Sequence, residues 1–458
     1  MTTTATQTAT LPQSTDNDHQ EHVVLLDSLR NAQLRQTEFI GVVGLGYVGL
    51  PLAIELADKF ENVVGFDISL RRVTSLLNGL DQTGEIDKKR LLSSELAVTN
   101  DPLKLADATF YIVTVPTPID ANRQPDLALL RNACRLIGSF LNKGNVVVFE
   151  STVYPGVTED ICVPILEAES GLKVTFDFNI GYSPERTNPG DRQHPVNKIV
   201  KLASADTTEA LERVASVYEA VIGAGVFRCQ SIKVAEAAKV LENTQRDVNI
   251  ALMNEMAMIC GRLGINTHAV IDAASTKWNF QPYTPGLVGG HCISVDPYYL
   301  SAVSEQIGYQ PRVIQSSRRV NESVAHYIAT EAMKQLAARG LSAKDARVGV
   351  FGLSFKENVP DLRNSKTFDI VAELQEFSIN SMVHDPIVND LDVADYGIQL
   401  CNFNEMSDLD IAILCVGHKE YVSDLDVPSK LSSCGALMDV KSVLQNYTLK
   451  DGQTYWSL

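Results

Sequence analysis

Short apolar segments alternate with helix-like segments over the first half of the chain. From Phe39 the order is an apolar strand, a glycine-rich turn, a helical stretch and a second strand that ends at Asp67. The same pattern predicts further strands at residues 109–115, 145–150, 179–183 and 198–203. Because strands and helices that alternate in this way form parallel sheets with helices on both faces, we expect a doubly wound α/β domain.

Long helices are predicted in the middle of the chain. Residues 231–263 contain no proline, a single late glycine, and Ala, Leu, Ile and Met at helical spacing, which predicts one unusually long helix that bridges two domains. A stretch rich in proline and glycine follows at 281–297, and a second helix is predicted at 313–339. Strand signals return at 347–351, 381–384, 410–416 and 437–440, which indicates a second, smaller α/β domain.

Composition and charge narrow the classes of function. A chain of 458 residues is long enough for two or three domains. The formal net charge of −17 would repel nucleic acid and anionic lipid surfaces. No apolar run approaches the roughly 20 residues of a membrane-spanning helix, so no membrane partner is expected. The eight cysteines form no C-x-x-C pair, so neither a disulfide framework nor a metal site is predicted, and a reducing cytoplasm fits best.

A glycine fingerprint follows the first strand. Gly44, Gly46 and Gly49 have the spacing G-x-G-x-x-G and stand between a strand and a helix. The first glycine makes the tight turn, the second lets the backbone approach a pyrophosphate, and the third lets the helix pack on the strand. The pyrophosphate would lie at a helix N-terminus beside Tyr47 and Val48, where free N–H groups favour anions. We therefore expect a dinucleotide site.

Two neighbouring segments extend this predicted site. Asp67 is expected to accept hydrogen bonds from the adenosine ribose and to favour NAD over NADP. Arg71 and Arg72 follow closely and could soften that preference, or could simply form a solvated first helical turn. Thr117, in Thr-Val-Pro-Thr-Pro, stands at the end of another strand, where ligands of open α/β sheets gather, although taken alone it is an ordinary start of a loop.

Cys292 is the candidate nucleophile. Gly289 and Gly290 precede it and would let a substrate approach its sulfur. Asp296 lies one helical turn beyond the cysteine if the chain turns helical there. Most cysteines are small buried hydrophobes, and this interpretation is accepted for the other seven. His291 could simply brace the loop.

Polar residues on the predicted long helix form a second candidate cluster. Lys239, Asn243 and Arg246 share one face of that helix. If this face is buried, the three polar side chains need hydrogen-bonding or charged partners. The alternative is that the face is solvated, or that it forms structural salt bridges with Glu236 or Glu242. Carboxylates and hydroxyls also follow two predicted strands, in segments 150–152 and 183–191, and the strand ends of one sheet converge on one edge.

Together these motifs resemble the UDP-glucose/GDP-mannose dehydrogenase family, from about Phe39 to the C-terminus. The glycine fingerprint, Thr-Val-Pro-Thr-Pro, Glu-Ser-Thr, Ser-Pro-Glu, the helix with Lys239 and Asn243, Gly-Gly-His-Cys-Ile-x-Val-Asp-Pro and Gly-Leu-Ser-Phe-Lys occur in the family's order. The resemblance implies two Rossmann-like domains, one for NAD at 37–228 and one for a UDP-sugar at 341–458. A long helix and a helical dimerisation segment, with the cysteine loop, join them at 229–340. Residues 1–36 lie outside the resemblance and are expected to be a disordered extension without a secretion signal.

Several motifs are most similar to one branch of this family. Ser-Pro-Glu-Arg at 183–186, Asn-Pro-Gly-Asp at 188–191 and Lys-Trp-Asn-Phe at 277–280 look like those of UDP-N-acetylhexosamine 6-dehydrogenases of capsule and O-antigen pathways. The resemblance implies an NAD-dependent, four-electron oxidation of the C6 hydroxymethyl group to a carboxylate. UDP-N-acetylglucosamine is favoured, and its galacto and manno epimers or UDP-glucose are the alternatives. A homodimer is expected.

The resemblance also implies roles for residues. Cys292 would capture the aldehyde as a thiohemiacetal, which a second oxidation turns into a thioester. Lys239 is expected to lower the pKa of the thiol toward neutrality and, with Asn243, to stabilise the oxyanion. Glu185 would be the base for hydrolysis, with Thr152 orienting the water. The catalytic set is Cys292, Lys239, Asp296, Asn243, Glu185 and Thr152. The cofactor set is Gly44, Gly46, Tyr47, Val48, Gly49, Asp67, Arg72, Thr117 and Thr152. The substrate set is Glu185, Arg186, Lys239, Asn243, Arg246, Gly289, Lys356 and Arg363.

Two rival functions remain open on these residues. A two-electron β-hydroxyacid dehydrogenase also combines a Rossmann domain with a Lys-x-x-x-Asn helix, but it needs no cysteine. A protein that senses NAD without turnover would not require Cys292, Lys239 and Glu185 together.

Overall fold

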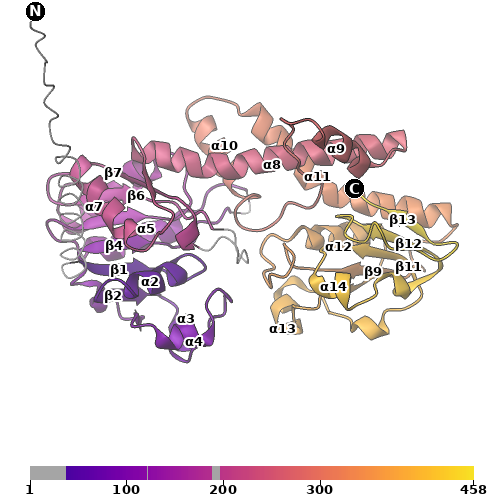
Figure 1. Cartoon of the computed structure of the whole chain (residues 1–458), viewed down its shortest axis with the longest axis horizontal. Coiled ribbons are helices and arrows are strands. Elements are labelled where there is room, and N and C mark those ends of the chain that lie inside the picture. The colour runs from indigo at the N-terminus through magenta and orange to yellow at the C-terminus, as the bar shows by residue number, and fades with distance from the viewer. Residues whose placement is uncertain (1–37, 121, 188–195) are drawn as a thin grey trace, which may run out of the picture.

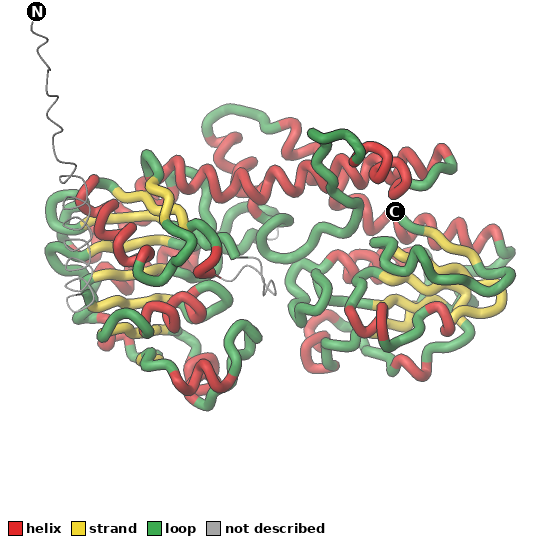
Figure 2. The backbone as a smooth tube through the Cα atoms, in the orientation of Figure 1, coloured by secondary structure: helices red, strands yellow, loops and turns green. Residues whose placement is uncertain are grey.

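The computed structural model describes residues 38–120, 122–187 and 196–458, so the predicted extension at 1–36 and the motif at 188–191 lie outside the described residues. Two α/β domains occupy the ends of an elongated molecule, and the long helix α8 (Ile232–Leu263) connects them (Figure 1). Figure 2 shows strands gathered in the two end domains, with helices and loops along the connecting segment. The predicted α/β class with two doubly wound domains is confirmed.

The N-terminal domain is built on one eight-stranded sheet. Strands such as Val-Val-Val-Phe of β5 are buried throughout, as strands covered by helices on both faces require. The spatial order is β3-β2-β1-β4-β5-β6-β7-β8, and its first six strands have the order of a dinucleotide-binding fold. One pair departs from the parallel arrangement, because β7 runs antiparallel to β6. The strands are β1 (Phe39–Val43), β2 (Asn62–Phe66), β3 (Ala97–Thr99), β4 (Phe110–Val113), β5 (Val146–Phe149), β6 (Asn179–Tyr182), β7 (Lys201–Ala205) and β8 (Val226–Arg228).

The helices of this domain connect successive strands. They are α2 (Gly49–Ala57), α3 (Leu70–Leu77), α4 (Lys88–Ser93), α5 (Ala128–Gly138), α6 (Val163–Ser170) and α7 (Thr208–Glu219). A π-helix, η2 (Val157–Cys162), precedes α6 directly. The strand order reverses between β1 and β4, so the carboxyl ends of these strands form the crevice where open α/β sheets bind ligands.

The central segment, residues 229–340, consists of helices and the loops between them. Ser231 begins α8 by accepting a hydrogen bond from the N–H of Val234, and Gly264 ends it in the left-handed conformation. The other helices are α9 (Thr267–Ser275), α10 (Asp296–Gln306) and α11 (Arg312–Ala338). Helix α11 packs along α8 on one side, and its buried residues Val324 and Ile328 join the core of the C-terminal domain on the other. The central segment is therefore continuous with both end domains.

The C-terminal domain is a parallel five-stranded sheet in the order β10-β9-β11-β12-β13. Its strands are β9 (Val348–Phe351), β10 (Ser381–His384), β11 (Leu409–Leu414), β12 (Leu431–Asp439) and β13 (Thr454–Trp456), and its helices are α12 (Lys366–Glu376), α13 (Asp390–Val393) and α14 (Lys419–Ser423).

The two α/β domains share the design of their first turn. Gly352 follows β9 with φ +88°, as Gly44 follows β1 with φ +101°. After the next strand, Asp385 and Asp67 each accept a hydrogen bond from the N–H of the residue after that glycine. In the C-terminal domain, however, buried His418 places Nε2 3.2 Å from Oδ2 of Asp385. In the C-terminal domain, the carboxylate of Asp385 is therefore engaged by a histidine inside the protein.

Candidate active site

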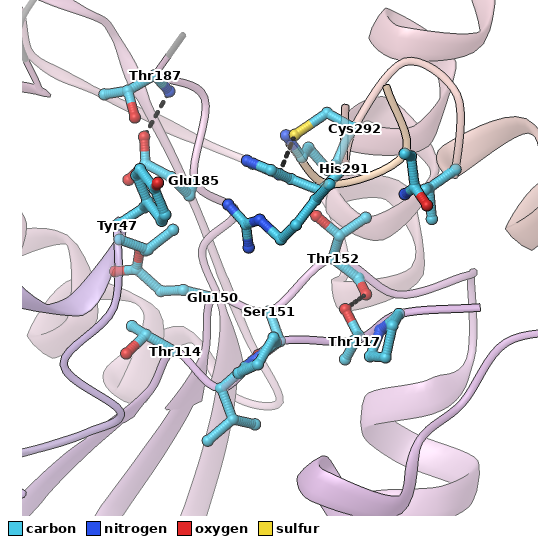
Figure 3. Close-up of a pocket in the computed structure, with 18 of the residues that line it drawn as sticks. Tyr47, Thr114, Thr117, Glu150, Ser151, Thr152, Glu185, Thr187, His291 and Cys292 are labelled. Carbon is cyan, nitrogen blue, oxygen red and sulfur yellow. Dashed lines mark hydrogen bonds between the residues drawn. The ribbon is translucent and has the colours of Figure 1, made fainter. Parts of the chain in front are cut away.

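A cavity of about 570 Å³ lies at the carboxyl ends of β1, β4, β5 and β6 (Figure 3). Residues of the C-terminal domain, among them Arg363, Phe368 and Tyr396, also line it. Parallel strands and the central helix thus bring residues from distant parts of the sequence to one place. The predicted site residues that line the cavity are Tyr47, Val48, Thr117, Thr152, Glu185, Lys239, Cys292 and Arg363.

The glycine turn has the shape that a dinucleotide requires. A Cβ atom at Gly49 would lie 1.8 Å from the carbonyl oxygen of Gly44, so only glycine lets the helix approach the strand here. A Cβ atom at Gly46 would meet no atom within 4 Å, which leaves open space where the pyrophosphate is expected. Asp67 is half-buried, and its Oδ2 accepts the N–H of Leu45 at 3.0 Å. These residues fit NAD.

Arg72, predicted to touch the cofactor, braces the turn from inside the protein. Its side chain is buried, its Nε donates to the carbonyl of Leu45 at 2.8 Å, and its Nη1 lies 2.8 Å from Oδ1 of Asp81. Arg72 does not line the cavity.

Cys292 stands at the turn that leads into α10. The N–H of Asp296 donates to the carbonyl of Cys292 at 2.9 Å, which is the helical turn that the sequence suggested. Sγ of Cys292 lies 3.1 Å from Nδ1 of His291, a contact drawn as a dashed line in Figure 3. Burial raises the pKa of the thiol to about 11, although Lys239 acts to lower it. The expectation of a pKa lowered toward neutrality is wrong, because desolvation outweighs the nearby ammonium.

The polar stripe of α8 is buried and internally connected, so a solvated face is excluded. Lys239 is 6% exposed and Asn243 is 1% exposed. Nδ2 of Asn243 donates to Oδ2 of Asp296 at 2.5 Å, and Arg246 donates to the amide oxygen of Asn243. Burial raises the pKa of Asp296 to about 6, although the charge of Lys239 and the hydrogen bond from Asn243 act to lower it. Asn243 thus holds Asp296, and neither it nor Arg246 lines the cavity.

Glu185 is a buried carboxylate on the cavity wall. Its Oε1 accepts the N–H groups of Arg186 at 2.7 Å and of Thr187 at 2.5 Å. Burial would raise the pKa of Glu185, but Lys201 and the bonds from Thr187 hold it below its ordinary value. An ionised carboxylate therefore faces the cavity.

Several predicted substrate residues lie outside the cavity lining. Nη2 of Arg186 is 2.7 Å from Oε1 of Glu242, so this guanidinium is paired with α8. Gly289 lies under the C-terminal domain, where an added Cβ would be 2.7 Å from the carbonyl oxygen of Asn364. Lys356 is half-buried, away from the lining.

Arg363, by contrast, joins the two end domains within the cavity. Its guanidinium lies 4.8 Å from the ring centroid of Tyr47 in the glycine turn, and its Nη2 is 2.6 Å from Oδ2 of Asp361. Such a cation–π contact helps to hold the C-terminal domain against the glycine turn.

Sequence reasoning missed other residues at this site. Lys201, inside the strand predicted at 198–203 and the first residue of the observed β7, lies between Glu150 and Glu185. Phe368 and Tyr396 line the C-terminal side of the cavity with rings stacked at 4.3 Å. A lysine at the start of an apolar strand is only a weak sequence signal of a site residue. The aromatic pair gives no such signal, because α12 needs apolar residues such as Phe368 for packing in any case. Among the described residues, no cluster of metal-ligating side chains and no helix long and apolar enough to cross a membrane is found.

A dinucleotide turn that shares its cavity with a cysteine, a buried lysine and an ionised carboxylate defines the chain as an NAD-dependent dehydrogenase. Its three parts match models of one family in order: the NAD binding domain at residues 38–222, the central domain at 233–323 and the UDP binding domain at 349–446. The chain belongs to the UDP-glucose/GDP-mannose dehydrogenase family, as its motifs predicted.

Individual relatives are similar over nearly the whole chain. Protein CapL of Staphylococcus aureus is 46% identical over 421 residues, which covers 92% of this chain and 99% of CapL. A UDP-N-acetyl-D-glucosamine 6-dehydrogenase of Pseudomonas aeruginosa is 51% identical over 384 residues, 83% of this chain and 91% of that enzyme. Among solved structures, UDP-D-ManNAc dehydrogenase of Pyrococcus horikoshii matches with a TM-score of 0.83 and 28% identity, covering 91% of this chain and 98% of that one.

Proposed function

We propose that this dehydrogenase oxidises C6 of a UDP-N-acetylhexosamine, with UDP-N-acetylglucosamine favoured, for surface polysaccharide synthesis. The observation that carries the proposal is the shared cavity of Cys292, Lys239, Glu185 and the glycine turn. The N-acetyl sugar is supported by two relatives, the UDP-N-acetyl-D-glucosamine 6-dehydrogenases of Pseudomonas aeruginosa and Salmonella typhi, which are 51% and 46% identical to this chain. A cytoplasmic location is supported by the eight cysteines, which are all free.

The overall reaction takes one hydroxymethyl group, two NAD and one water to a carboxylate, two NADH and three protons. NAD, when bound, accepts the hydride of each oxidation. A water held by Lys239 and Asp296 takes the proton of the 6-hydroxyl and passes it to the carboxylate of Asp296. Asn243 contributes by holding the Asp296 carboxylate in place.

Cys292 retains the aldehyde between the two oxidations. Its sulfur bonds to the aldehyde carbon as the thiol proton passes through Nδ1 of His291, 3.1 Å from Sγ, to water. The ammonium of Lys239 stabilises the oxyanion of the thiohemiacetal. After the second oxidation the carbon is a thioester. Water then attacks this carbon, Glu185 takes the proton of the water, the C–S bond breaks, and Cys292 leaves as a thiolate.

We infer a homodimer from the outer face of α8. Five exposed apolar side chains recur there at spacings of whole helical turns: Val234, Leu241, Leu252, Ile259 and Leu263. A continuous exposed apolar stripe is typical of a surface that another chain covers.

The proposal is tested with a panel of UDP-hexoses and UDP-N-acetylhexosamines. We expect two NADH per sugar consumed, with the highest kcat/KM for UDP-N-acetylglucosamine. Cys292→Ser should lower turnover by more than about 1,000-fold, the scale seen when a covalent nucleophile is removed. Cys434→Ser, at an exposed cysteine of the C-terminal domain, is the matched control. Nearly full turnover by Cys292→Ser, or one NADH per sugar, would favour the two-electron rival instead.

A further inference from the structure

Lys201 is a buried ammonium behind the wall of the cavity. Its side chain is 4% exposed, and its Nζ lies 2.6 Å from Oε2 of Glu150 and 3.7 Å from Oε2 of Glu185. Both carboxylates line the cavity, whereas Lys201 does not. The ammonium of Lys201 therefore interacts with both carboxylates. It forms a hydrogen bond to Glu150 and acts on Glu185 through its charge.

The two carboxylates are held differently. Both oxygens of Glu150 are committed, one to Lys201 and the other to the hydroxyl of Tyr218, which donates to it at 2.5 Å. Burial raises the pKa of Glu150 in spite of Lys201. Glu185 is fixed on Oε1 by two backbone N–H groups, and its Oε2 is the oxygen that faces Lys201. Backbone N–H groups thus orient the carboxylate of Glu185, and the nearby lysine together with these hydrogen bonds keeps it ionised.

Within the described part of the chain, the charged groups that face Glu185 come from three elements. Lys201 comes from β7, Lys239 from α8, and Glu150 from the end of β5 beyond Lys201. Tyr218 of α7 lies behind Glu150, with its ring centroid 5.1 Å from Nζ of Lys201. Two buried carboxylates that repel each other, as Glu150 and Glu185 do, do not both ionise without a cation between them. Lys239 is already required at the reacting carbon, so among the described residues Lys201 is the cation available for this pair.

We propose that Lys201 is a positioning residue for the hydrolytic half of the reaction, keeping Glu185 ionised as the base for the water that attacks the Cys292 thioester. The inference rests on the proposed function. In this step the O–C bond forms, the C–S bond breaks, the proton goes from water to Glu185, and the sulfur leaves as a thiolate. Lys201 touches none of the reacting atoms and acts only through Glu185.

The experiment follows the Cys292 thioester by rapid quench and intact-mass spectrometry between pH 5 and pH 8, with NADH counted in parallel. The wild-type decay rate should be flat over this range, because Glu185 is ionised throughout. In Lys201→Met the decay should slow as the pH falls, because loss of an opposite charge within about 4–6 Å raises a carboxyl pKa by about 1–3 units. Lys201→Arg retains the charge and should keep the flat profile.

Glu150→Gln separates this role from a structural one. It breaks the same 2.6 Å pair as Lys201→Met, yet it leaves Lys201 facing Glu185 alone, so its profile should stay flat. If Lys201 served only to neutralise Glu150, the two variants would change alike, and that result would overturn the inference. A flat profile in folded Lys201→Met would do the same.

Two further outcomes are decisive. If Lys201→Met does not fold, Glu150→Gln still tests the inference, because a decay rate that slows toward low pH in this variant contradicts it. A wild-type enzyme that forms no adduct and gives one NADH per sugar refutes the proposed function itself. Two NADH with an unshifted Lys201→Met profile refutes only the role of Lys201.

Discussion

Cys292 has neighbours that act on its ionisation in opposite directions. Burial and the carboxylate of Asp296 favour the thiol, while Lys239, Arg246 and Arg363 favour the thiolate. His291 places Nδ1 at hydrogen-bond distance from the sulfur, and burial lowers the pKa of His291 to about 4, so its neutral ring is able to accept the thiol hydrogen. The nucleophile is therefore held as an oriented thiol, and its ionisation depends on charge in the cavity.

Alkylation measures this balance directly. Because the thiol pKa is about 11, the rate of iodoacetamide labelling at Cys292 should rise about tenfold per pH unit from pH 7 to 9 without levelling. Lys239→Met should lower the rate at least about tenfold at each pH, since it removes the largest charge that favours the thiolate. Lys233→Met, on an exposed part of the same helix, is the control. A rate that levels off near pH 8 would contradict the raised pKa.

At the scale of single residues, motifs predicted the members of the site but not their partners. Cys292, Lys239 and Glu185 stand in local sequence patterns, and all three line the cavity. Lys201 acts through Glu150 and Glu185, which are distant from it in the chain, and no local pattern marks such pairs. The sign of the effect of Lys239 on the thiol was predictable, whereas the larger effect of burial depends on packing that only the fold shows.

At the scale of elements, Glu236 of α8 supports the π-helix η2. Its two oxygens accept the N–H groups of Gly156 at 2.6 Å and of Thr158 at 3.0 Å, at the start of that helix. The sequence had suggested a partner for Lys239 instead. Burial raises the pKa of Glu236 to about 7, so the folded protein holds a proton there that the unfolded chain releases near pH 4.5.

The stability of the protein should depend on pH through this residue. Because the folded pKa lies above the unfolded one, the contribution of Glu236 is fully present below about pH 4.5 and is lost as the pH rises through about 7. Relative to Glu236→Gln, the wild type should lose about 2 kcal/mol between pH 5 and pH 8, at about 1.4 kcal/mol per pKa unit. Denaturant unfolding at both pH values measures the difference. Glu159→Gln, on the exposed side of η2, retains Glu236 and should keep the pH-dependent loss of stability. An equal difference in stability between the wild type and Glu236→Gln at both pH values would contradict the prediction.

Element boundaries were predictable where the signal is local. The long helix was predicted at 231–263 and spans Ile232–Leu263, because Ser231 and Gly264 carry start and stop signals in the sequence. The three-residue strands β3, β8 and β13 were not predicted, since edge strands this short lack a periodic pattern. Nothing in the sequence of β7 indicates its direction, and its antiparallel pairing depends on the neighbouring strand.

At the scale of the whole molecule, two similar domains have diverged in their first turns. Asp67 anchors an open glycine turn, whereas Asp385 also contacts the side chain of His418, which is fully buried. The second half lacks the glycine fingerprint, so sequence reasoning predicted the domain but not the shared turn. The C-terminal domain reaches the cavity through other residues, among them Arg363, Phe368 and Tyr396.

The apolar stripe on α8 makes the oligomeric state testable. Leu241 and Leu252 are more than half exposed near the middle of the helix, between the two end domains. In a dimer closed across this face, Leu241→Asp with Leu252→Asp would bury unpaired charges and so favour the monomer. Light scattering should give twice the mass of one chain for the wild type and a single mass for the double variant. Leu391→Asp, at an exposed leucine of the C-terminal domain, should remain dimeric, and a monomeric wild type at micromolar concentration would contradict the inferred assembly.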